Sequence, residues 1–158
     1  MFCISTFIVC SFIQEIFTIK EHLTKLKHIV GVICGKIKPD QREKYRIDFS
    51  NGNLDFLILQ SAAGIGIDGL QKNCNHMYFY SRSYSYKDNY QIEARLFRSG
   101  LKNKLLIVDF TSWIENNKTG KLKPTIDLEI LKNLENKKET AHDLIKNTIR
   151  SFKENYEK

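Results

Sequence analysis

The stretch LDFLILQSAAGIGIDGLQ at residues 54–71 decides the fold, because it joins a nearly continuous apolar run to a glycine-bearing loop. The apolar run, Leu54–Gln60, is typical of a strand that is buried on both faces of a parallel sheet. The loop at 61–71 would then lie at the carboxyl edge of that sheet, where open α/β folds bind their ligands. Gly64 and Gly66 would let the backbone approach a phosphate and donate its N–H groups, although a lone GxG is more often only a tight turn.

Outward from this stretch, short β-branched or aromatic runs alternate with helical patterns. This alternation predicts an α/β fold in which a parallel sheet is flanked by helices. Besides the run at 54–60, strands are expected near Thr6–Cys10, Ile29–Ile33, His76–Ser81 and Lys104–Phe110.

Three helices are expected between these strands. The first carries five apolar residues at helical spacing: Phe12, Ile16, Ile19, Leu23 and Leu26. The second begins with Pro39, which suits the first position of a helix, and stops at Asn51-Gly52. The third begins around Tyr86 and contains QIEARLFRSG, residues 91–100.

Beyond the last strand the character of the sequence changes. Residues 116–124 are polar and basic and predict a loop, and Trp113 is also placed on a loop. Residues 125–156 are rich in Leu, Lys, Glu and Asn at helical spacing. We therefore divide the chain into a lobe at 1–110 and, at 111–158, a loop and helical tail that is packed on the lobe.

The composition is that of a folded protein with a basic surface. Its hydrophobic share of 42% and charged share of 27% match a soluble globular domain rather than a disordered chain. The net charge is +7 and the pI about 9.2, which favours an anionic partner such as nucleic acid. Basicity is also common in plain soluble domains, so the charge supports such a partner without identifying it.

The spacing of the cysteines excludes a metal-binding protein, and the character of the apolar start of the chain excludes a secreted or membrane-spanning one. Cys3, Cys10, Cys34 and Cys74 form no CxxC pair and lack matched histidines, so no metal site is predicted and buried thiols in a reducing compartment are expected. The apolar segment at 1–17 lacks a basic start and a cleavage site, and polar residues interrupt it. It is interpreted as core rather than as a signal peptide or membrane span, which predicts an intracellular protein with no membrane contact.

Gln91, Arg95 and Arg98 lie at positions i, i+4 and i+7 of the third helix and so share one face. By itself this stripe could be a solvated face that ends in a glycine cap. The start of this helix, however, is expected at the same sheet edge as the glycine loop. Arginine presents a rigid, permanently charged fork that fits phosphate oxygens, so two arginines opposite a phosphate-binding loop outline a phosphoryl-transfer site.

Three segments occur in a recognisable order: GKIKPDQREKYRIDFSNGNLDFLILQ at 35–60, SAAGIGIDGLQ at 61–71 and HMYFYSRSYSYKDNYQIEARLFRSG at 76–100. They resemble the second RecA-like lobe of superfamily 2 helicases, most closely the Swi/Snf-like branch found in phage and mobile elements. The family's RxxxIxxF pattern is matched by Arg42 or Arg46 with Phe49. Its AGxGxxLQ pattern (motif V) is matched by Gly64, Gly66, Leu70 and Gln71. Its QxxxRxxRxG pattern (motif VI) is matched by Gln91, Arg95, Arg98 and Gly100. IVCSFIQEIF at 8–17 is similar to the motif IV segment, and TIDLEILKNLENK at 125–137 to the helix after the last strand, so the likeness covers nearly the whole chain.

The resemblance implies that ATP binds between this lobe and a second one, to which this lobe supplies arginine fingers. Arg98 would be the principal finger and Arg95 its partner. The nucleotide would be contacted by three further residues: Gln91, Asp68 and Gly66. The nucleic-acid backbone would be contacted by three others: Gly64, Gln71 and Arg42. Two positions depart from the Swi/Snf-like pattern, since Leu101 replaces a glutamine and Asp68 looks like the aspartate that DEAD-box relatives use near the ATP ribose.

The other half of an ATPase site is missing from these 158 residues. The sequence contains no GxxxxGK[ST] P-loop and no acidic D-E-x-H type motif, so ATP with Mg²⁺ would need ligands from an amino-terminal RecA-like lobe in cis or in trans. The chain alone is therefore expected to be inactive. DNA is the expected partner and RNA a possible one, in the cytoplasm or the nucleus, with a virus or a mobile element as a possible source.

Three interpretations stay open. The chain is the carboxyl lobe of a DNA helicase or translocase that works with an amino-terminal lobe, or a non-enzymatic nucleic-acid-binding or regulatory module of RecA-like fold. The third interpretation is an unrelated α/β domain whose motifs match by coincidence. It gains support if the arginine helix lies far from the glycine loop.

Overall fold

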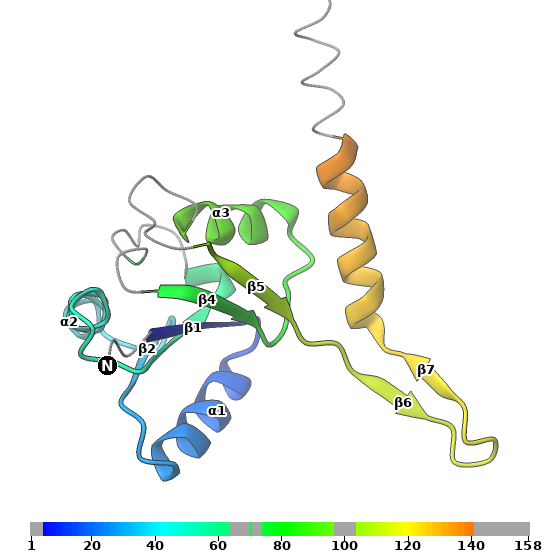
Figure 1. Ribbon diagram of the computed structural model, residues 1–158, viewed down its shortest axis with the longest axis horizontal. Coiled ribbons are helices and arrows are strands. Elements are labelled where there is room, and N and C mark those ends of the chain that lie inside the picture. Colours follow the sequence, from blue (N-terminus) through cyan, green and yellow to red (C-terminus); the bar gives the residue numbers. More distant parts are fainter. Residues whose placement is uncertain (1–4, 64–69, 71–73, 97–103, 141–158) are drawn as a thin grey trace, which may run out of the picture. The chain divides into compact units, whose positions relative to one another are not determined.

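The structure is a computed structural model (Figure 1), and it describes residues 5–63, 70, 74–96 and 104–140. The chain divides into two compact units, Met1–Ser112 and Trp113–Lys158, and each is described by itself. In the described ranges, no helix is both long enough and apolar enough to cross a lipid bilayer.

The first unit is built on a five-stranded sheet with the order β2-β3-β1-β4-β5, in which every neighbouring pair is parallel. The strands are β1 Ser5–Cys10, β2 Val30–Ile33, β3 Phe56–Gln60, β4 Cys74–Phe79 and β5 Leu106–Asp109. The predicted parallel sheet flanked by helices is thus confirmed. Strand ends differ from the predicted ones by a few residues; β4, for example, ends at Phe79 rather than Ser81, because its pairing with β1 stops there.

Among the described residues of this unit, three α-helices cover the two faces of the sheet (Figure 1). α1 spans Ile13–Lys25 and packs on β1, β2 and β3. α2 spans Pro39–Ser50 and α3 spans Tyr86–Leu96, and both contribute to the core layer on the opposite face. Pro39 is the first residue of α2, as predicted, because its fixed φ suits that position.

Side chains of β3 alternate between two core layers, because successive residues of a strand point to opposite faces. Ile58 packs with Ile16 of α1, whereas Leu57 and Leu59 lie in the layer that contains Phe49 of α2. All five side chains are buried. This two-sided burial explains the nearly continuous apolar run that identified β3 in the sequence.

The apolar face of α1 is shorter than predicted. Ile16 is fully buried, and Ile19 and Leu23 pack against the same core layer. Phe12 precedes the first turn in an extended conformation and is 65% exposed, and Leu26 follows the last turn and is 69% exposed. The prediction was wrong at both ends of the helix, because residues at the caps lack helical dihedral angles and do not continue its buried stripe.

The second unit begins with a β-hairpin where a loop was predicted. β6 spans Trp113–Glu115 and β7 spans Leu122–Pro124, and the two strands pair antiparallel. The predicted loop is confirmed at 116–121, which form the turn of the hairpin, but the loop prediction was wrong for Leu122–Pro124 and for Trp113, which lie in strands. All residues of both strands are exposed, and the strands lack the alternation of apolar and polar residues by which a half-buried strand is recognised.

The hairpin turn is closed by backbone hydrogen bonds. The Asn116 carbonyl accepts hydrogen bonds from the N–H groups of Thr119 and Gly120. Gly120 has a φ of +63°, a backbone angle that residues other than glycine rarely adopt. The Asn116 N–H in turn donates to the Lys121 carbonyl. A helix follows at 126–140, so the predicted helical tail is confirmed over the described residues, while its packing on the lobe stays a prediction.

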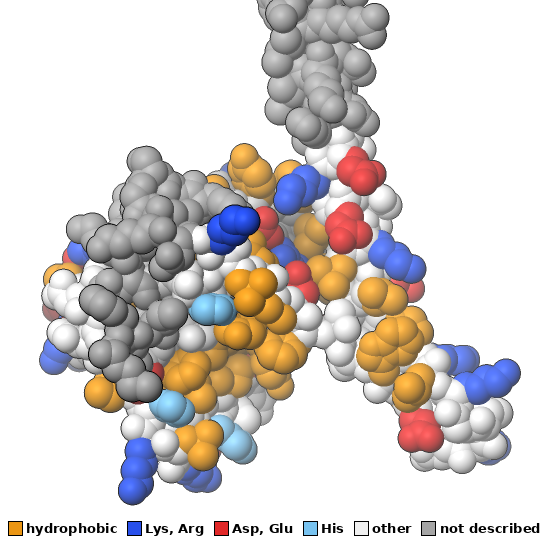
Figure 2. Space-filling view, viewed as in Figure 1, with side chains coloured by type: hydrophobic (Ala, Val, Ile, Leu, Met, Phe, Trp, Pro, Cys, Tyr) orange, Lys and Arg blue, Asp and Glu red, His pale blue; other side chains and the backbone are white. Residues whose placement is uncertain are grey.

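Hydrophobic side chains gather over β4 and β5 on the face seen in Figure 2. Tyr78 stacks on His76 and on Phe110, with ring centroids 6.5 and 6.0 Å apart, and Tyr80 contacts Phe110 at 6.3 Å. Tyr80 and Phe110 are about half exposed. These rings therefore pack with one another, within β4 and across to the end of β5.

Replacing Gly31 of β2 by alanine is expected to lower the free energy of unfolding by about 1–3 kcal/mol. The added Cβ would lie 2.6 Å from Leu54 Cδ1 and 3.1 Å from a Tyr45 ring carbon, in a buried layer. Gly35→Ala is the control, because the nearest atom to its added Cβ, Gln60 Oε1, is 3.8 Å away. Urea unfolding followed by circular dichroism measures both variants, and equal stabilities would contradict this account of the β2 packing.

Candidate functional site

The carboxyl ends of all five strands meet at one edge of the sheet, because every strand runs in the same direction. There β3 leads into a short 3₁₀ helix, η1, at Ser61–Ala63, and so into the predicted glycine loop. Ser61 before the loop is 6% exposed, and Leu70 near its end is 1% exposed and belongs to the core. The glycine loop therefore begins at the edge where parallel α/β sheets bind ligands.

α3 lies directly beside η1. It begins at Tyr86, after the carboxyl end of β4, and Ile92 fixes it to the core with an exposed fraction of 2%. Gln91 and Arg95 share one face of the helix, and both are partly buried. The structure thus brings the described part of the arginine helix to the start of the glycine loop, which counts against a coincidental match of the motifs.

The predicted site residues that remain are divided between described and undescribed parts of the chain. Arg42 lies on α2, and its Nε donates to the Ile37 carbonyl at 2.6 Å, so it holds the loop that follows β2. Arg46, the other candidate for this motif, is paired with Glu43 on the same helix at 2.6 Å. Five residues lie outside the described ranges, and their roles stay predictions: Gly64, Gly66, Asp68, Gln71 and Arg98.

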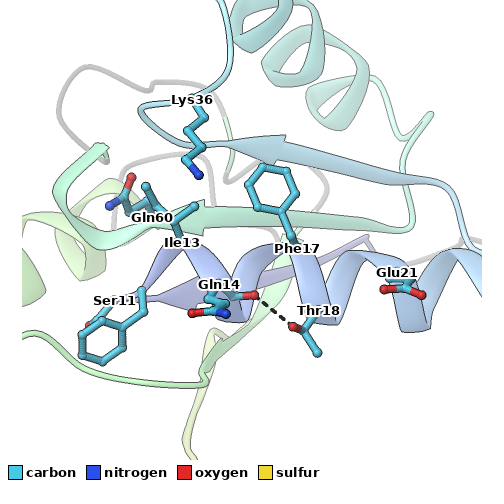
Figure 3. A pocket seen from close by; sticks show the side chains of 9 residues that line it. Ser11, Ile13, Gln14, Phe17, Thr18, Glu21, Lys36 and Gln60 are labelled. Carbon is cyan, nitrogen blue, oxygen red and sulfur yellow. Dashed lines mark hydrogen bonds between the residues drawn. The ribbon is translucent and has the colours of Figure 1, made fainter.

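An open pocket of about 790 Å³ lies at the same edge, around the start of α1 (Figure 3). Its lining includes Gln14 and Phe17 of α1, Lys36 from the loop after β2, and Gln60 from the end of β3. The Gln60 side chain is oriented by the Gly35 N–H, which donates to its Oε1 at 3.2 Å. The exposed amine of Lys36 and the positive end of the α1 dipole make the pocket suitable for an anionic group.

Sequence reasoning did not select Lys36 or Gln60 as site residues. Lys36 follows closely on a predicted strand and Gln60 ends one, but a single lysine or glutamine forms no motif. The two side chains line one pocket because β2 and β3 are paired neighbours in the sheet, which no single segment specifies. Glu21 also lines the pocket, so its wall is not uniformly basic.

A polar network joins the ends of β1 and β4 at this edge. The Ser81 hydroxyl accepts a hydrogen bond from the Ser11 N–H at 2.7 Å and donates one to Glu15 at 2.6 Å. Glu15 also accepts from the Phe12 N–H at 3.2 Å, which satisfies an amide at the start of α1. The start of α1 is thereby held against the loop that follows β4.

Two of the described cysteines, Cys10 and Cys74, are held in states of low reactivity. Cys10, Cys34 and Cys74 are free and buried, as predicted, while Cys3 lies outside the described residues. Burial, and after it the charge of Glu15, raises the pKa of Cys10 to about 12, and burial raises the pKa of Cys74 to about 11. Thiols with such pKa values stay protonated near neutral pH and are poor nucleophiles.

A partly buried arginine lies on the β4 and β5 side of the edge. Two nitrogens of Arg82, Nε and Nη2, donate to the two carboxylate oxygens of Asp109 at 2.5 and 3.1 Å. Its Nη1 donates to Glu93 of α3 at 2.7 Å, and its guanidinium carbon lies 3.6 Å from the centre of the Phe79 ring. Burial disfavours the charged form, but the bonds to both carboxylates prevail and raise the pKa of Arg82, so the group stays charged.

Comparisons with known proteins find matches for the unit that carries this edge. Residues 4–100, more than half of the chain, match a family model described as the helicase conserved C-terminal domain. The solved C-terminal part of the Fun30 ATPase domain is similar with a TM-score of 0.59 and 20% identity, over 66% of this chain and 34% of that one. The C-terminal domain of S. cerevisiae Dbp5, solved as a variant bound to a Gle1 variant and IP6, is similar with a TM-score of 0.60 and 15% identity, over 86% of this chain and 70% of that one. No curated protein sequence matches the chain.

Identities this low show a shared fold and not a shared activity. Both structures support the predicted RecA-like architecture of the parallel sheet and its helices. The chain spans about a third of the length of the Fun30 structure. The residues matched by the family model run from before β1 through α3, and so include the glycine loop, the pocket, and Arg82 with its partner Glu93, while Asp109 lies beyond them.

Ser81→Ala is expected to lower the free energy of unfolding by about 1–3 kcal/mol, because it removes both the acceptor for the Ser11 N–H and the donor to Glu15. Thr18→Ala is the control, since the exposed Thr18 hydroxyl donates only to the Gln14 carbonyl of its own helix. The control should change stability by no more than about 0.5 kcal/mol. Chemical denaturation of both variants measures the difference, and equal losses would refute a special role for the Ser81 network.

Proposed function

The chain belongs to the helicase conserved C-terminal domain family, and on this premise we propose that it is the C-terminal lobe of an ATP-dependent DNA helicase or translocase of the Swi/Snf-like branch. In this role the lobe supplies arginine fingers to ATP and contacts to the nucleic-acid backbone. The likeness to the C-terminal part of the Fun30 ATPase domain supports the link to ATP hydrolysis. The order and spacing of the three motif segments support the choice of branch.

The observation that carries this proposal is the position of α3 beside η1. α3 bears Gln91 and Arg95, and η1 opens into the loop that contains Gly64 and Gly66. Arg98 continues the same stripe in the sequence. A γ-phosphate held in front of this stripe would meet guanidinium forks, which stabilise the charge that develops on the phosphoryl group in the transition state.

The nucleotide site is shared with a second lobe. Gln91, Asp68 and Gly66 contact ATP from this side, whereas the cradle for the phosphates and the Mg²⁺ ligands come from an amino-terminal P-loop lobe in cis or in trans. Arginine fingers act only on a phosphate that is already held. The chain alone is therefore inactive, and ATP hydrolysis requires the assembled pair of lobes.

The nucleic-acid backbone approaches the carboxyl edge of the sheet and is contacted by Gly64, Gln71 and Arg42. The pocket at the start of α1 supports this part of the proposal, because Lys36 and Gln60 place a cation and an amide at the same edge. Backbone phosphates are bound by such groups regardless of sequence. The lobe thus binds the phosphate backbone of DNA without contacting the bases.

A second function, a non-enzymatic nucleic-acid-binding or regulatory module, is favoured by one observation. The pocket with Lys36 and Gln60 is formed entirely by this chain, whereas the ATP site is not. Such a module would bind nucleic acid in a salt-dependent manner, because phosphate contacts release counterions, and ATP would not change the affinity. The proposed translocase lobe, in its assembled form, responds to ATP.

Arg98→Ala is expected to lower DNA-stimulated ATP hydrolysis of the assembled enzyme by about 10³-fold or more, because it removes a cation that acts on the transition state. The measurement is the rate of phosphate release with and without duplex DNA. Lys25→Gln is the control, since it removes an exposed cation of α1 that is paired only with Glu21 four residues away. Undiminished turnover of the Arg98 variant, with the fold intact, would reject the enzymatic proposal.

Lys36→Gln is expected to weaken binding of duplex DNA to a similar extent for all sequences, and to reduce the slope of log affinity against log salt by about 1. The lost contact is one phosphate contact at the pocket. Lys118→Gln in the exposed hairpin turn of the second unit is the matched control and should leave the slope unchanged. Fluorescence anisotropy at two or more salt concentrations gives both slopes, and identical slopes for the two variants would exclude the pocket from the binding surface.

A further inference from the structure

Arg82 connects three elements of the lobe through one guanidinium group. It follows β4, binds Asp109 at the end of β5 and binds Glu93 on α3, and its side chain is only 11% exposed. The carboxylates are partly buried too, with side-chain exposures of 26% for Asp109 and 18% for Glu93. α3 is therefore linked to the sheet by directed charged bonds as well as by the apolar contact of Ile92.

The position of Glu93 on α3 determines how its bond to Arg82 affects the rotation of the helix about its axis. Glu93 is two residues from both Gln91 and Arg95, so its side chain points roughly 200° around the helix axis from each of theirs. The apolar contact of Ile92 by itself allows the helix to roll about its axis. The bond from Glu93 to Arg82 opposes that roll, because rotation of the helix would break it. The face with Gln91 and Arg95 is therefore oriented from the opposite side of the helix.

Stability alone does not require such a cluster. Removing one guanidinium and two carboxylates from water is costly, and replacement of a buried ion pair by apolar residues is often neutral or stabilising. An apolar contact, however, does not fix the rotational orientation of the helix. The paired bonds to Asp109 and the single bond to Glu93 constrain angles as well as distances, which suits the cluster to holding α3 at one rotation.

We propose that Arg82 is a positioning residue for the arginine face of α3: by holding Glu93 against Asp109, it keeps Gln91 and Arg95 in the geometry that a nucleotide phosphate requires. This role rests on the proposed function, in which that face contacts ATP. Arg82 itself touches neither ATP nor nucleic acid. Misplacement of a reacting group by about 1 Å can cost about 10²-fold in rate, so loss of the cluster lowers turnover while every contact residue is still present.

Two variants test this role in the assembled enzyme, with the amino-terminal P-loop lobe present. The triple variant Arg82→Met, Glu93→Gln, Asp109→Asn removes all three charges together, so no unpaired charge is left buried. Arg82→Lys keeps the charge but lacks the planar fork that bridges two carboxylates. Lys25→Gln, which breaks an exposed ion pair on α1, is the matched control.

In both Arg82 variants, kcat for DNA-stimulated ATP hydrolysis is expected to fall about 10- to 100-fold. KM for ATP changes far less, because the arginine face acts on the transition state. The melting temperature of the triple variant stays near that of the parent, while amide hydrogen exchange becomes faster in α3 but not in β1 or β3. If the folded variants keep the parental kcat, or if exchange in α3 is unchanged, the positioning role is overturned.

Arg95→Ala, measured in parallel, separates this proposal from the proposed function. Full turnover of both Arg95→Ala and Arg98→Ala means that the arginine stripe does not act on ATP, and the role of Arg82 then falls with it. Loss of turnover in Arg95→Ala, with parental kcat in the Arg82 variants, overturns only the positioning role. If the triple variant does not fold, the test rests on Arg82→Lys. A lower kcat of the folded Arg82→Lys protein, at the parental KM, supports the positioning role of Arg82. A parental kcat overturns it.

Discussion

The parallel pairing of β1 with both β3 and β4 is the constraint on which the rest of the structure depends. β1 is paired along its length, from Thr6 beside Phe56 to Cys10 beside Gln60, and with β4 on its other side. Because neighbouring strands run in the same direction, each connection returns across the sheet and each strand delivers its following loop to one edge. The start of the glycine loop, the start of α1 and the start of α3 share that edge for this reason.

The polar groups at this edge are held by bonds between loops that are distant in the chain. Ser81 bonds to Ser11 and Glu15 on the β1 side, and Arg82 bonds to Asp109 on the β5 side. Because polar groups that leave water need partners, these bonds give the edge one defined geometry. This suits the phosphate binding that we propose for the edge, since its amides and cations are then in place before a ligand arrives. The core beneath supplies stability, and the polar bonds add orientation to it.

Much of the lobe could be predicted because its signals are local. The apolar run of β3 reflects burial on both faces, and Pro39 marked the start of α2. The sequence-based prediction failed where the pattern of apolar residues in a segment does not match the burial of those residues. Phe12 continues the helical spacing of α1 but lies at its cap and is exposed, and the hairpin around Gly120 has exposed strands without an apolar alternation.

By itself, the sequence determined which segments of the lobe form strands and helices and in which order the motifs occur, because burial pattern and spacing are properties of each segment. The tertiary structure alone decided which distant side chains meet. Lys36 shares a pocket with Gln60 because β2 and β3 are neighbours, and Arg82 reaches Asp109 because β4 is paired with β5. Strand order follows from packing the whole sheet between its helices, so it cannot be read from the spacing of residues within any one segment.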